Sequence, residues 1–327
     1  MTSKNPNPFL FVICLAWLLP QMISTCSTEN EERSKLPMNW TPVDSLNMTL
    51  PEDIRLYSGS NDSLPLRAWY VYIDERHPEI FTRTVVSDDT TDNREPVSSF
   101  ARDLGACVVV NGGYFTMYRT PARHVGLLVS DGAILEHATN FVTRDSIRYE
   151  IARAAIGFSR DDDIDISWVS TRNDTLYSWP SPPQNKPGKP ASRLRYQQAR
   201  VWKVQDALAA GPALIVDGRI HITSDQEVFF GTSIPKTHPR TAIGYTAEGA
   251  LIVMVVDGRQ DRSRGVTLEE LAILMRDLGV VEAMNLDGGG SSTLVVNNTL
   301  VNRPTGGTNE REVMSAIATF VKPKIGN

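Results

Sequence analysis

Short apolar segments separated by turn residues recur along this chain, and most of them have the pattern of β-strands. Residues 67–74 (RAWYVYID) alternate as a half-buried strand does, and residues 106–111 (ACVVVN) predict a buried strand that ends at Asn111. Residues 126–135 and 213–220 each place two apolar arms around an Asp-Gly pair, which predicts two β-hairpins.

Two segments have a helical pattern instead. Residues 96–105 (PVSSFARDLG) predict a short helix that ends at a glycine. Residues 267–279 begin with Thr267 and Glu270, the two residues of a capping box, and end at Gly279. This second helix places four leucines on one stripe: Leu268, Leu271, Leu274 and Leu278.

The last third of the chain is the most regular part. Strands are predicted over residues 240–246, 250–256, 280–287 and 293–302. Residues 179–192 contain too many prolines for regular structure and predict a surface loop. We therefore expect an α+β fold, a single domain with a mixed, twisted β-sheet core and a few flanking helices.

The N-terminal 1–26 segment has the pattern of an export signal. Lys4 precedes an apolar stretch at residues 9–20 that is too short to span a bilayer. The segment ends in MISTC, which predicts a bacterial lipoprotein signal with a lipid on Cys26; an ordinary signal cut near Thr25 is the alternative. Residues 27–51 are polar and predict a linker, and residues 52–327 predict the folded domain.

The composition of the chain restricts its cellular location and its binding partners. With 41% hydrophobic and 22% charged residues, the chain has the makeup of a globular protein. A net charge of −5 without a dense Lys/Arg stripe predicts no nucleic-acid partner. Once the signal is removed and Cys26 is lipidated, Cys107 is left without a disulfide partner, which favours an exported protein of the bacterial cell envelope, in the periplasm or at the outer membrane or cell surface.

Polar groups followed by glycine stand where several apolar strands end. The stretches are NGGYF after Asn111, DGR after Val256 and DGGGSS after Leu286. Strand alternation places Asp257 on the face of Val253 and Val255, and it places Asp287 with Asn285 on one face of a later strand. If these strand ends converge, they form a concave site on a rigid scaffold.

An Asp-Gly pair after a strand is usually only a turn, and this explanation suffices for Asp131 and Asp217. It fails for Asp257, because GRQDRSRG follows in place of a returning apolar arm. It also fails for the three consecutive glycines at 288–290, since a hairpin needs one or two. Consecutive glycines let successive amide groups approach a ligand, so we expect an anion-binding nest here.

Other glycine-rich and catalytic motifs do not match. The chain has no G-x-G-x-x-G and no G-x-x-x-x-G-K-[ST], which argues against a nucleotide fold. Ser291 and Ser292 lack the G-x-S-x-G elbow, so we expect them to donate hydrogen bonds to substrate oxygens. The histidines lack metal-ligand spacing, and no cofactor is expected.

Three arginines lie beside the strand-end acids: Arg240, Arg259 and Arg311. A guanidinium matches a phosphate or a carboxylate bidentately. Arg240 is the strongest of the three candidates, because an arginine that opens a buried strand needs a reason.

Taken together and in order, these motifs resemble the phosphodiester glycosidase family. The resemblance covers about the last two thirds of the chain and identifies residues 52–327 as a phosphodiester glycosidase-like catalytic domain. It implies hydrolysis of a sugar-1-phosphodiester at the anomeric carbon, with release of the free sugar and a phosphomonoester. The matching segments are NGGYF (111–115), AGPALI (210–215), HPRTAIG (238–244), DGR (257–259), NLDGGGSST (285–293), ERE (310–312) and AIATF (316–320).

The resemblance also suggests roles. A carboxylate must face the oxocarbenium-like carbon as nucleophile or base; Asp287 is the first candidate, Asp257 the second and Glu310 the third. The expected substrate-binding residues are Asn111, Gly112, Gly113, Arg240, Thr241, Arg259, Gly288, Gly289, Gly290, Ser291, Ser292 and Arg311.

Two alternatives remain open. In a metal-dependent phosphoesterase, Asp257, Asp261 and Asp287 would hold a divalent cation and water would attack phosphorus. In a non-catalytic envelope lipoprotein, the same arginines and glycines would capture sugar phosphates without cleaving them. In each case the partner is a sugar phosphate or glycan, and the membrane is reached only through a lipid on Cys26.

Overall fold

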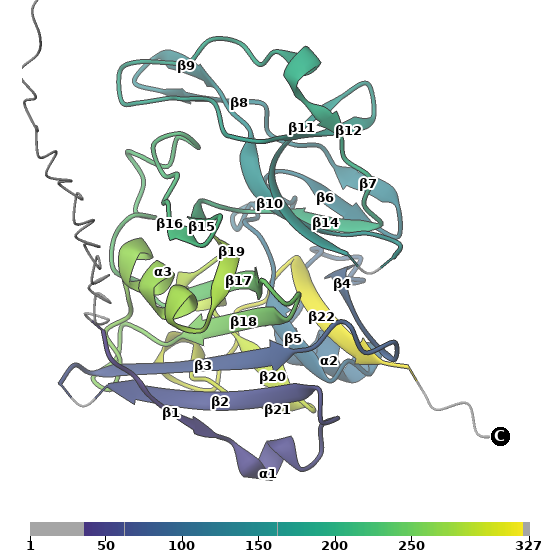
Figure 1. Ribbon diagram of the computed structural model, residues 1–327, viewed down its shortest axis with the longest axis vertical. Coiled ribbons are helices and arrows are strands. Elements are labelled where there is room, and N and C mark those ends of the chain that lie inside the picture. The colour runs from purple at the N-terminus through teal and green to yellow at the C-terminus, as the bar shows by residue number, and fades with distance from the viewer. Residues whose placement is uncertain (1–35, 62, 162, 323–327) are drawn as a thin grey trace, which may run out of the picture. The chain divides into compact units, whose positions relative to one another are not determined.

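Antiparallel strands make up most of the regular structure in the computed structural model, which describes residues 36–61, 63–161 and 163–322 (Figure 1). The described residues form one compact unit. Each strand pair found in the described residues runs antiparallel.

The largest sheet has eight strands in the order β1-β2-β3-β18-β17-β19-β15-β16. Their bounds are β1 Asn39–Pro42, β2 Ile54–Asn61, β3 Leu66–Ile73, β15 Ala213–Val216, β16 Arg219–Ile220, β17 Arg240–Thr246, β18 Leu251–Val256 and β19 Val280–Asn285. β17 lies between β18 and β19, so both edges of this strand are hydrogen-bonded to neighbouring strands.

A seven-stranded sheet and a five-stranded sheet complete the core. The seven-stranded order is β13-β12-β11-β10-β14-β6-β7, with β6 Leu128–Ser130, β7 Ala133–Glu136, β10 Arg153–Phe158, β11 Ile164–Arg172, β12 Thr175–Trp179, β13 Arg200–Val201 and β14 Asp206–Ala209. The five-stranded order is β21-β20-β5-β22-β4, with β4 Ile80–Val86, β5 Val108–Asn111, β20 Leu294–Val296, β21 Thr299–Leu300 and β22 Ser315–Val321. A separate hairpin pairs β8 Phe141–Arg144 with β9 Ile147–Glu150.

Helices are few and short in the described part of the chain. They are α1 Asp44–Asn47, α2 Val97–Leu104 and α3 Leu268–Asp277, with single 3₁₀ turns η1 Tyr196–Gln198, η2 Gly289–Ser291 and η3 Pro304–Gly306. None of the described helices has the length and apolar character needed to cross a membrane. The capping box predicted for α3 is confirmed, because Thr267 accepts from the Glu270 amide and Glu270 accepts from the Thr267 amide.

Strand alternation divides the core into layers. In β18, Val253 and Val255 face the central core between the sheets, whereas Ile252 and Met254 face the buried side of α3. Figure 1 shows α3 lying over the eight-stranded sheet and α2 lying beside β5 and β22. The central core therefore packs against one face of the strands whose ends carry the polar and glycine motifs, and the helices pack against the other.

The expected α+β class is wrong, because the described chain is mostly β and its sheets are antiparallel, not mixed. A mixed sheet needs parallel neighbours, but the described strand pairs are antiparallel both where a turn joins them, as in β10 and β11, and where they are far apart in sequence, as in β3 and β18. Segments that the sequence analysis did not assign, such as residues 54–61, 141–150 and 164–179, are further strands. The predicted hairpins at 126–135 and 213–220 are confirmed.

The structure bears on part of the N-terminal predictions. Residues 39–42 pair with β2 and residues 44–47 form α1, so the fold already includes this part of the segment for which a linker is predicted. The predicted signal segment 1–26, with Cys26, lies outside the described residues.

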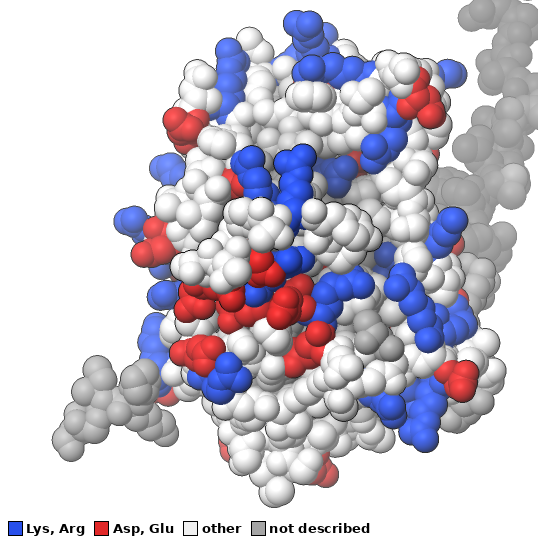
Figure 2. Space-filling view, turned by 180° about the vertical axis from the view of Figure 1, so that it is seen from behind, with Lys and Arg blue, Asp and Glu red and all other residues white. Residues whose placement is uncertain are grey.

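Charged side chains of both signs are interspersed on the face of the molecule seen in Figure 2. Acidic side chains gather near the middle of this face, with basic side chains on either side.

Candidate active site

A small polar cavity of about 130 Å³ lies where β17 begins and β19 ends. The two strands are antiparallel, with Ala242 opposite Asn285, so the first residue of β17 lies near the chain that leaves β19. The residues that line the cavity are Tyr114, Ser233, Ile234, His238, Arg240, Arg259, Asp287, Gly288, Gly289, Gly290 and Arg311.

Arg240 is buried and is held by backbone carbonyls. Its Nε donates to the carbonyl of Val266 at 3.2 Å, and its Nη2 donates to the carbonyls of Ile234, at 2.6 Å, and Lys236. Burial, together with the nearby charge of Arg259, lowers the pKa of this guanidinium to about 10. These contacts fix the position of the guanidinium but leave its charge without a compensating carboxylate.

Arg259 is positioned by a histidine. Its Nη2 lies 2.9 Å from His238 Nδ1, and because a guanidinium can only donate, Nδ1 accepts. His238 Nε2 therefore carries the ring hydrogen and donates to the Ser233 carbonyl at 2.8 Å. Burial and the nearby Arg240 and Arg259 charges lower the pKa of His238, which keeps the ring neutral at neutral pH.

The guanidinium of Arg311 lies directly beside Gly290. A Cβ atom at Gly290 would lie 2.6 Å from Arg311 Cζ, so the guanidinium occupies the space that a side chain would need. Together with the other two arginines it brings three positive charges to one cavity, and none of the three forms a salt bridge within the described residues. Such an excess of fixed positive charge in a concave site attracts an anion.

Asp287 is the single carboxylate among the lining residues. Burial raises its pKa from 3.8 to about 6, while the Ser291 hydroxyl, the Gly288 amide and the charge of Arg311 act in the opposite direction. The Gly288 amide donates to Asp287 Oδ1 at 2.8 Å. A carboxylate with a pKa near 6 is mostly ionised at neutral pH and still basic enough to accept a proton or attack an electrophile.

The glycine run serves mainly to make room. Four of the five amides from Gly288 to Ser292 donate within the chain, so the predicted anion-binding nest is largely occupied by internal bonds. A Cβ at Gly288 would lie 2.9 Å from the Pro239 carbonyl oxygen, and one at Gly289 would lie 3.2 Å from Arg259 Nη2. Gly289 also has a φ of +65°, a conformation that favours glycine. The three glycines thus let the backbone and two arginines approach closely.

Two of the three candidate carboxylates lie elsewhere. Asp257 is 2% exposed, and its Oδ1 accepts from Asn302 Nδ2 at 2.9 Å and from the Arg303 amide at 3.1 Å. Burial raises the pKa of Asp257, and these hydrogen bonds oppose the rise. Glu310 Oε2 accepts from the Ser98 amide at 2.9 Å and so caps the first turn of α2. Neither lines the cavity, and both connect segments of the fold.

Asn111 and Thr241 are buried links between sheets. Asn111 Nδ2 donates to the Asp287 carbonyl at 2.7 Å, and its Oδ1 accepts from Thr241 Oγ1 at 2.7 Å and from the Thr293 amide at 3.2 Å. The Asp287 amide donates to the Gly112 carbonyl at 3.1 Å. These contacts place Asp287 but leave Asn111 and Thr241 outside the cavity lining.

Close packing explains the glycines beside Asn111. A Cβ at Gly112 would lie 2.8 Å from the Ser315 carbonyl oxygen, and one at Gly113 would lie 2.6 Å from the Ala209 carbonyl oxygen. Ser291 and Ser292 are buried behind Asp287, at 0% and 1% exposure, and neither lines the cavity. The structure therefore brings Arg240, Arg259, Arg311, Asp287 and the three glycines to one place, and the other predicted binding residues lie outside the cavity lining.

The predicted substrate-binding set lacks some residues that line the cavity, although the aromatic pair after the Asn-Gly-Gly run, Tyr114 and Phe115, already suits a sugar ring on sequence grounds. Tyr114 lines the cavity, and its hydroxyl donates to the Gly211 carbonyl at 2.9 Å and accepts from Asn285 Nδ2 at 2.9 Å. Its place directly after the Asn-Gly-Gly run was the available signal. Ser233 and Ile234 carry no chemical pattern that could have pointed to them. The proline-rich loop at 179–192 does not line the cavity.

No group of three or more His, Cys, Asp or Glu side chains among the residues that the structure describes is arranged to hold a metal ion. In particular, Asp257 and Asp287, which the phosphoesterase alternative requires at one cation, do not line the same cavity.

Comparisons with known proteins place these features in context. The family model for phosphodiester glycosidases matches residues 104–320. N-acetylglucosamine-1-phosphodiester alpha-N-acetylglucosaminidase of Mus musculus is 30% identical over 221 residues, which are 65% of this chain and 36% of that protein. The SPbeta prophage-derived uncharacterized protein YomE of Bacillus subtilis is 28% identical over 227 residues, which are 69% of this chain and 30% of that protein. The chain thus matches about a third of the length of these curated relatives.

Solved structures share the fold. The zebrafish N-acetylglucosamine-1-phosphodiester alpha-N-acetylglucosaminidase catalytic domain, auto-inhibited by its pro-peptide, superposes with a TM-score of 0.58 at 21% identity, covering 89% of this chain and 92% of that chain. A hypothetical protein from Synechocystis gives a TM-score of 0.58 at 20% identity, covering 83% of this chain and 63% of that chain.

Proposed function

The chain belongs to the phosphodiester glycosidase family, and from this premise we propose that it hydrolyses a sugar-1-phosphodiester at the anomeric carbon. The products are the free sugar and a phosphomonoester. The names of the mammalian relatives point to N-acetylglucosamine as the sugar to test first.

One observation carries the proposal: three arginines without a salt-bridge partner in the described residues surround a single carboxylate of raised pKa in one cavity. The arginines suit the phosphate of the substrate, since a guanidinium pairs with phosphate oxygens bidentately. Asp287 suits the anomeric carbon, because an oxocarbenium-like transition state needs a carboxylate nearby.

The leaving group explains why one carboxylate is enough. When the C1–O bond breaks, its electron pair passes to a phosphate oxygen, and the resulting monoester is stable without protonation. Arg240, Arg259 and Arg311 stabilise the charge that develops on the departing phosphate, as preorganised donors do in an oxyanion hole. Asp287 then acts on the other side of the bond, as the nucleophile that forms a glycosyl ester or as the base that activates water.

Turnover of a synthetic substrate tests the proposal. The full chain is incubated with methyl N-acetylglucosamine-1-phosphodiester, and the products are identified by mass. Release of free N-acetylglucosamine with methyl phosphate supports glycosidase activity; an unchanged substrate, across a panel of hexose-1-phosphodiesters, contradicts it. The anomer released first, read by NMR, assigns Asp287, since retention requires a covalent intermediate and inversion requires direct attack by water.

The same assay separates the competing functions. In ¹⁸O-labelled water, attack at carbon places the label on the sugar, whereas a phosphoesterase places it on phosphate. A protein that only binds sugar phosphates saturates without product. The separation of Asp257 from the cavity favours the glycosidase over the metal-dependent phosphoesterase.

Export is a further part of the proposal. We infer a lipoprotein of the bacterial envelope from the first 26 residues and from the lack of a cysteine partner for Cys107. Mass spectrometry of the mature N-terminus tests this: a diacylglyceryl group on Cys26 supports it, and a mature chain that keeps residues 1–25 contradicts it.

A further inference from the structure

A larger pocket of about 450 Å³ adjoins the arginine cavity. It is lined by residues 114–119 together with Asp287 and Arg311. Tyr114, Asp287 and Arg311 line both spaces, so Asp287 lies at their boundary. Arg240 and Arg259 line only the smaller space, and the exposed Arg119 lines only the larger one, so the buried guanidinium of Arg240 lies on one side of Asp287.

The wall of the larger pocket is a loop that other segments hold in place. Its base is closed by backbone bonds, from the Thr116 amide to the Arg123 carbonyl at 2.9 Å and from the Val125 amide to the Tyr114 carbonyl at 2.7 Å. Thr116 Oγ1 also accepts from the Arg123 amide at 2.9 Å.

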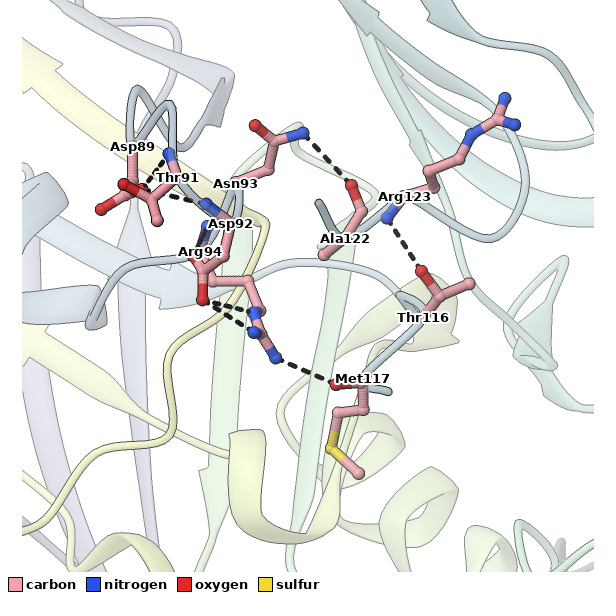
Figure 3. A network of polar contacts seen from close by, with 9 residues as sticks. All are labelled: Asp89, Thr91, Asp92, Asn93, Arg94, Thr116, Met117, Ala122 and Arg123. Atoms are coloured by element: carbon pink, nitrogen blue, oxygen red, sulfur yellow. Dashed lines mark hydrogen bonds and ion pairs between the residues drawn. The ribbon is translucent and has the colours of Figure 1, made fainter. Parts of the chain in front are cut away.

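A second loop, residues 89–94, supports the first from outside (Figure 3). Arg94 pairs with Asp92 through Nε at 3.1 Å and Nη2 at 2.7 Å, and its Nη1 donates to the Met117 carbonyl at 3.0 Å. Asn93 Nδ2 donates to the Ala122 carbonyl at 3.2 Å. The pocket is therefore formed before a ligand arrives, which reduces the ordering cost of binding.

The loop presents aromatic and apolar surface to the pocket. Tyr114, Phe115, Met117 and Tyr118 supply it, and Tyr118 is 96% exposed. A large aromatic side chain left almost wholly in water gains nothing for the fold, so its contact surface is available to a ligand. Aromatic faces pack well against the C–H faces of a pyranose ring.

We propose that residues 114–119 bind the glycosyl group of the substrate, with the phosphate in the arginine cavity on the other side of Asp287. This assignment rests on the proposed function and deepens it. The anomeric carbon joins the ring to the phosphate, so it must lie at Asp287, where the two spaces meet. Arg240 and Arg259 bind the phosphate on one side, and the ring lies against the aromatic side chains of residues 114–118 on the other. The aglycone then extends from the phosphate, away from residues 114–119.

Binding of two probes tests the assignment without requiring turnover. Isothermal titration compares N-acetylglucosamine-1-phosphate with inorganic phosphate on the full chain. We expect Tyr118→Ala to weaken the affinity for the sugar phosphate by about fivefold, the effect of losing one aromatic contact. The affinity for inorganic phosphate changes by less than about twofold. Met48→Ala is the control, because Met48 is 82% exposed and does not line either space. Both variants alter exposed side chains, so both fold.

Several results would overturn the assignment. The assignment fails if Tyr118→Ala lowers the affinity for both probes equally, or if it leaves the affinity for the sugar phosphate unchanged. It also fails if the wild-type protein binds the sugar phosphate no more tightly than inorganic phosphate. A kinetic arm excludes the aglycone as the occupant. Methyl and benzyl phosphodiesters of the same sugar suffer the same rise in KM in Tyr118→Ala, whereas a rise confined to the benzyl ester assigns the pocket to the aglycone. If binding behaves as expected but no ester is cleaved, the proposed hydrolysis fails while the sugar subsite stands.

Discussion

At the scale of single residues, the cavity separates groups that act from groups that support. Arg240 is bound by carbonyls, Arg259 by a neutral histidine and Arg311 by no hydrogen bond found within the described residues. These three environments predict different tolerance to substitution. Arg311 can be truncated without exposing a buried partner, whereas truncating Arg240 leaves buried carbonyls unpaired.

The substitution Asp287→Asn tests the chemical role of the carboxylate. We expect kcat to fall by at least about a hundredfold, because the amide can neither attack carbon nor accept a proton. Initial rates on a sugar-1-phosphodiester measure the effect. Asp174→Asn, a change at a side chain that is 88% exposed, serves as the control and keeps the wild-type rate. A wild-type rate in Asp287→Asn removes this residue from the chemistry.

The substitution Arg311→Ala tests phosphate recognition. We expect the loss of a charge-assisted hydrogen bond to weaken the affinity for inorganic phosphate by about tenfold or more, as measured by calorimetry. Arg262→Ala, at an exposed residue outside the cavity lining, removes the same charge and leaves the affinity nearly unchanged. Equal losses in the two variants would mean that only net charge matters, contrary to this placement.

The substitution Gly290→Ala tests the steric role of the glycine run. The new methyl group takes the space of the Arg311 guanidinium, so phosphate affinity falls about as far as in Arg311→Ala, while the melting temperature changes little because the arginine tip can move. Gly307→Ala is the matched control, since the nearest atom to its Cβ is 4.0 Å away. Unchanged phosphate binding in Gly290→Ala would refute the steric explanation.

At the scale of elements, the site is made by segments that end strands, and most of those strands could be predicted. The patterns of residues 106–111, 240–246 and 280–287 locate β5, β17 and β19, and the capping box locates α3. What single segments could not give is which strands are neighbours. The pairing of β17 with both β18 and β19, and of β5 with β20 and β22, joins residues far apart in sequence.

The substitution Arg94→Ala tests whether the network in Figure 3 holds the 114–119 wall in place. Loss of the bond to the Met117 carbonyl speeds hydrogen exchange of the Thr116 and Val125 amides by about tenfold and raises KM with little change in kcat. Arg76→Ala is a matched control, because Arg76 also pairs through Nε and Nη2 with the aspartate two residues earlier, Asp74, but makes no bond to the loop. Equal exchange in wild type and Arg94→Ala would show that the wall stands without this network.

At the scale of the whole molecule, the charge balance and length of the chain said little about the fold, and local patterns underestimated its β content. Strands such as β2, β4 and β10 to β12 lie between the motifs that attracted attention, and their apolar residues became interpretable only as faces of the central core. The expected convergence of Asp287 with the three arginines on one cavity is found, and their roles stay predictions. Asp257 and Glu310 were misplaced because an acid beside a glycine or arginine looks the same whether it faces a ligand or ties two loops together.

The raised pKa of Asp287 links activity to global stability. Between pH 3.8 and about 6 the folded protein holds this proton more tightly than the unfolded chain, so stability falls as pH rises through that range and stays lower above it. We expect Asp287→Asn to raise the melting temperature by a few degrees at pH 7 and to have no effect below pH 3.8. Calorimetric scans at the two pH values measure this. In parallel, the wild-type rate falls as pH drops below about 6. A melting temperature of Asp287→Asn below that of the wild type at pH 7 would contradict the predicted destabilisation by the buried, ionised carboxylate.

Asn111, the last residue of β5 in the five-stranded sheet, bonds to Thr241 of β17 in the eight-stranded sheet and to the carbonyl of Asp287. The position of Asp287 thus depends on hydrogen bonds that can form only when both sheets are in place. A chain in which the two sheets have not yet docked therefore lacks the assembled cavity that the proposed hydrolysis requires.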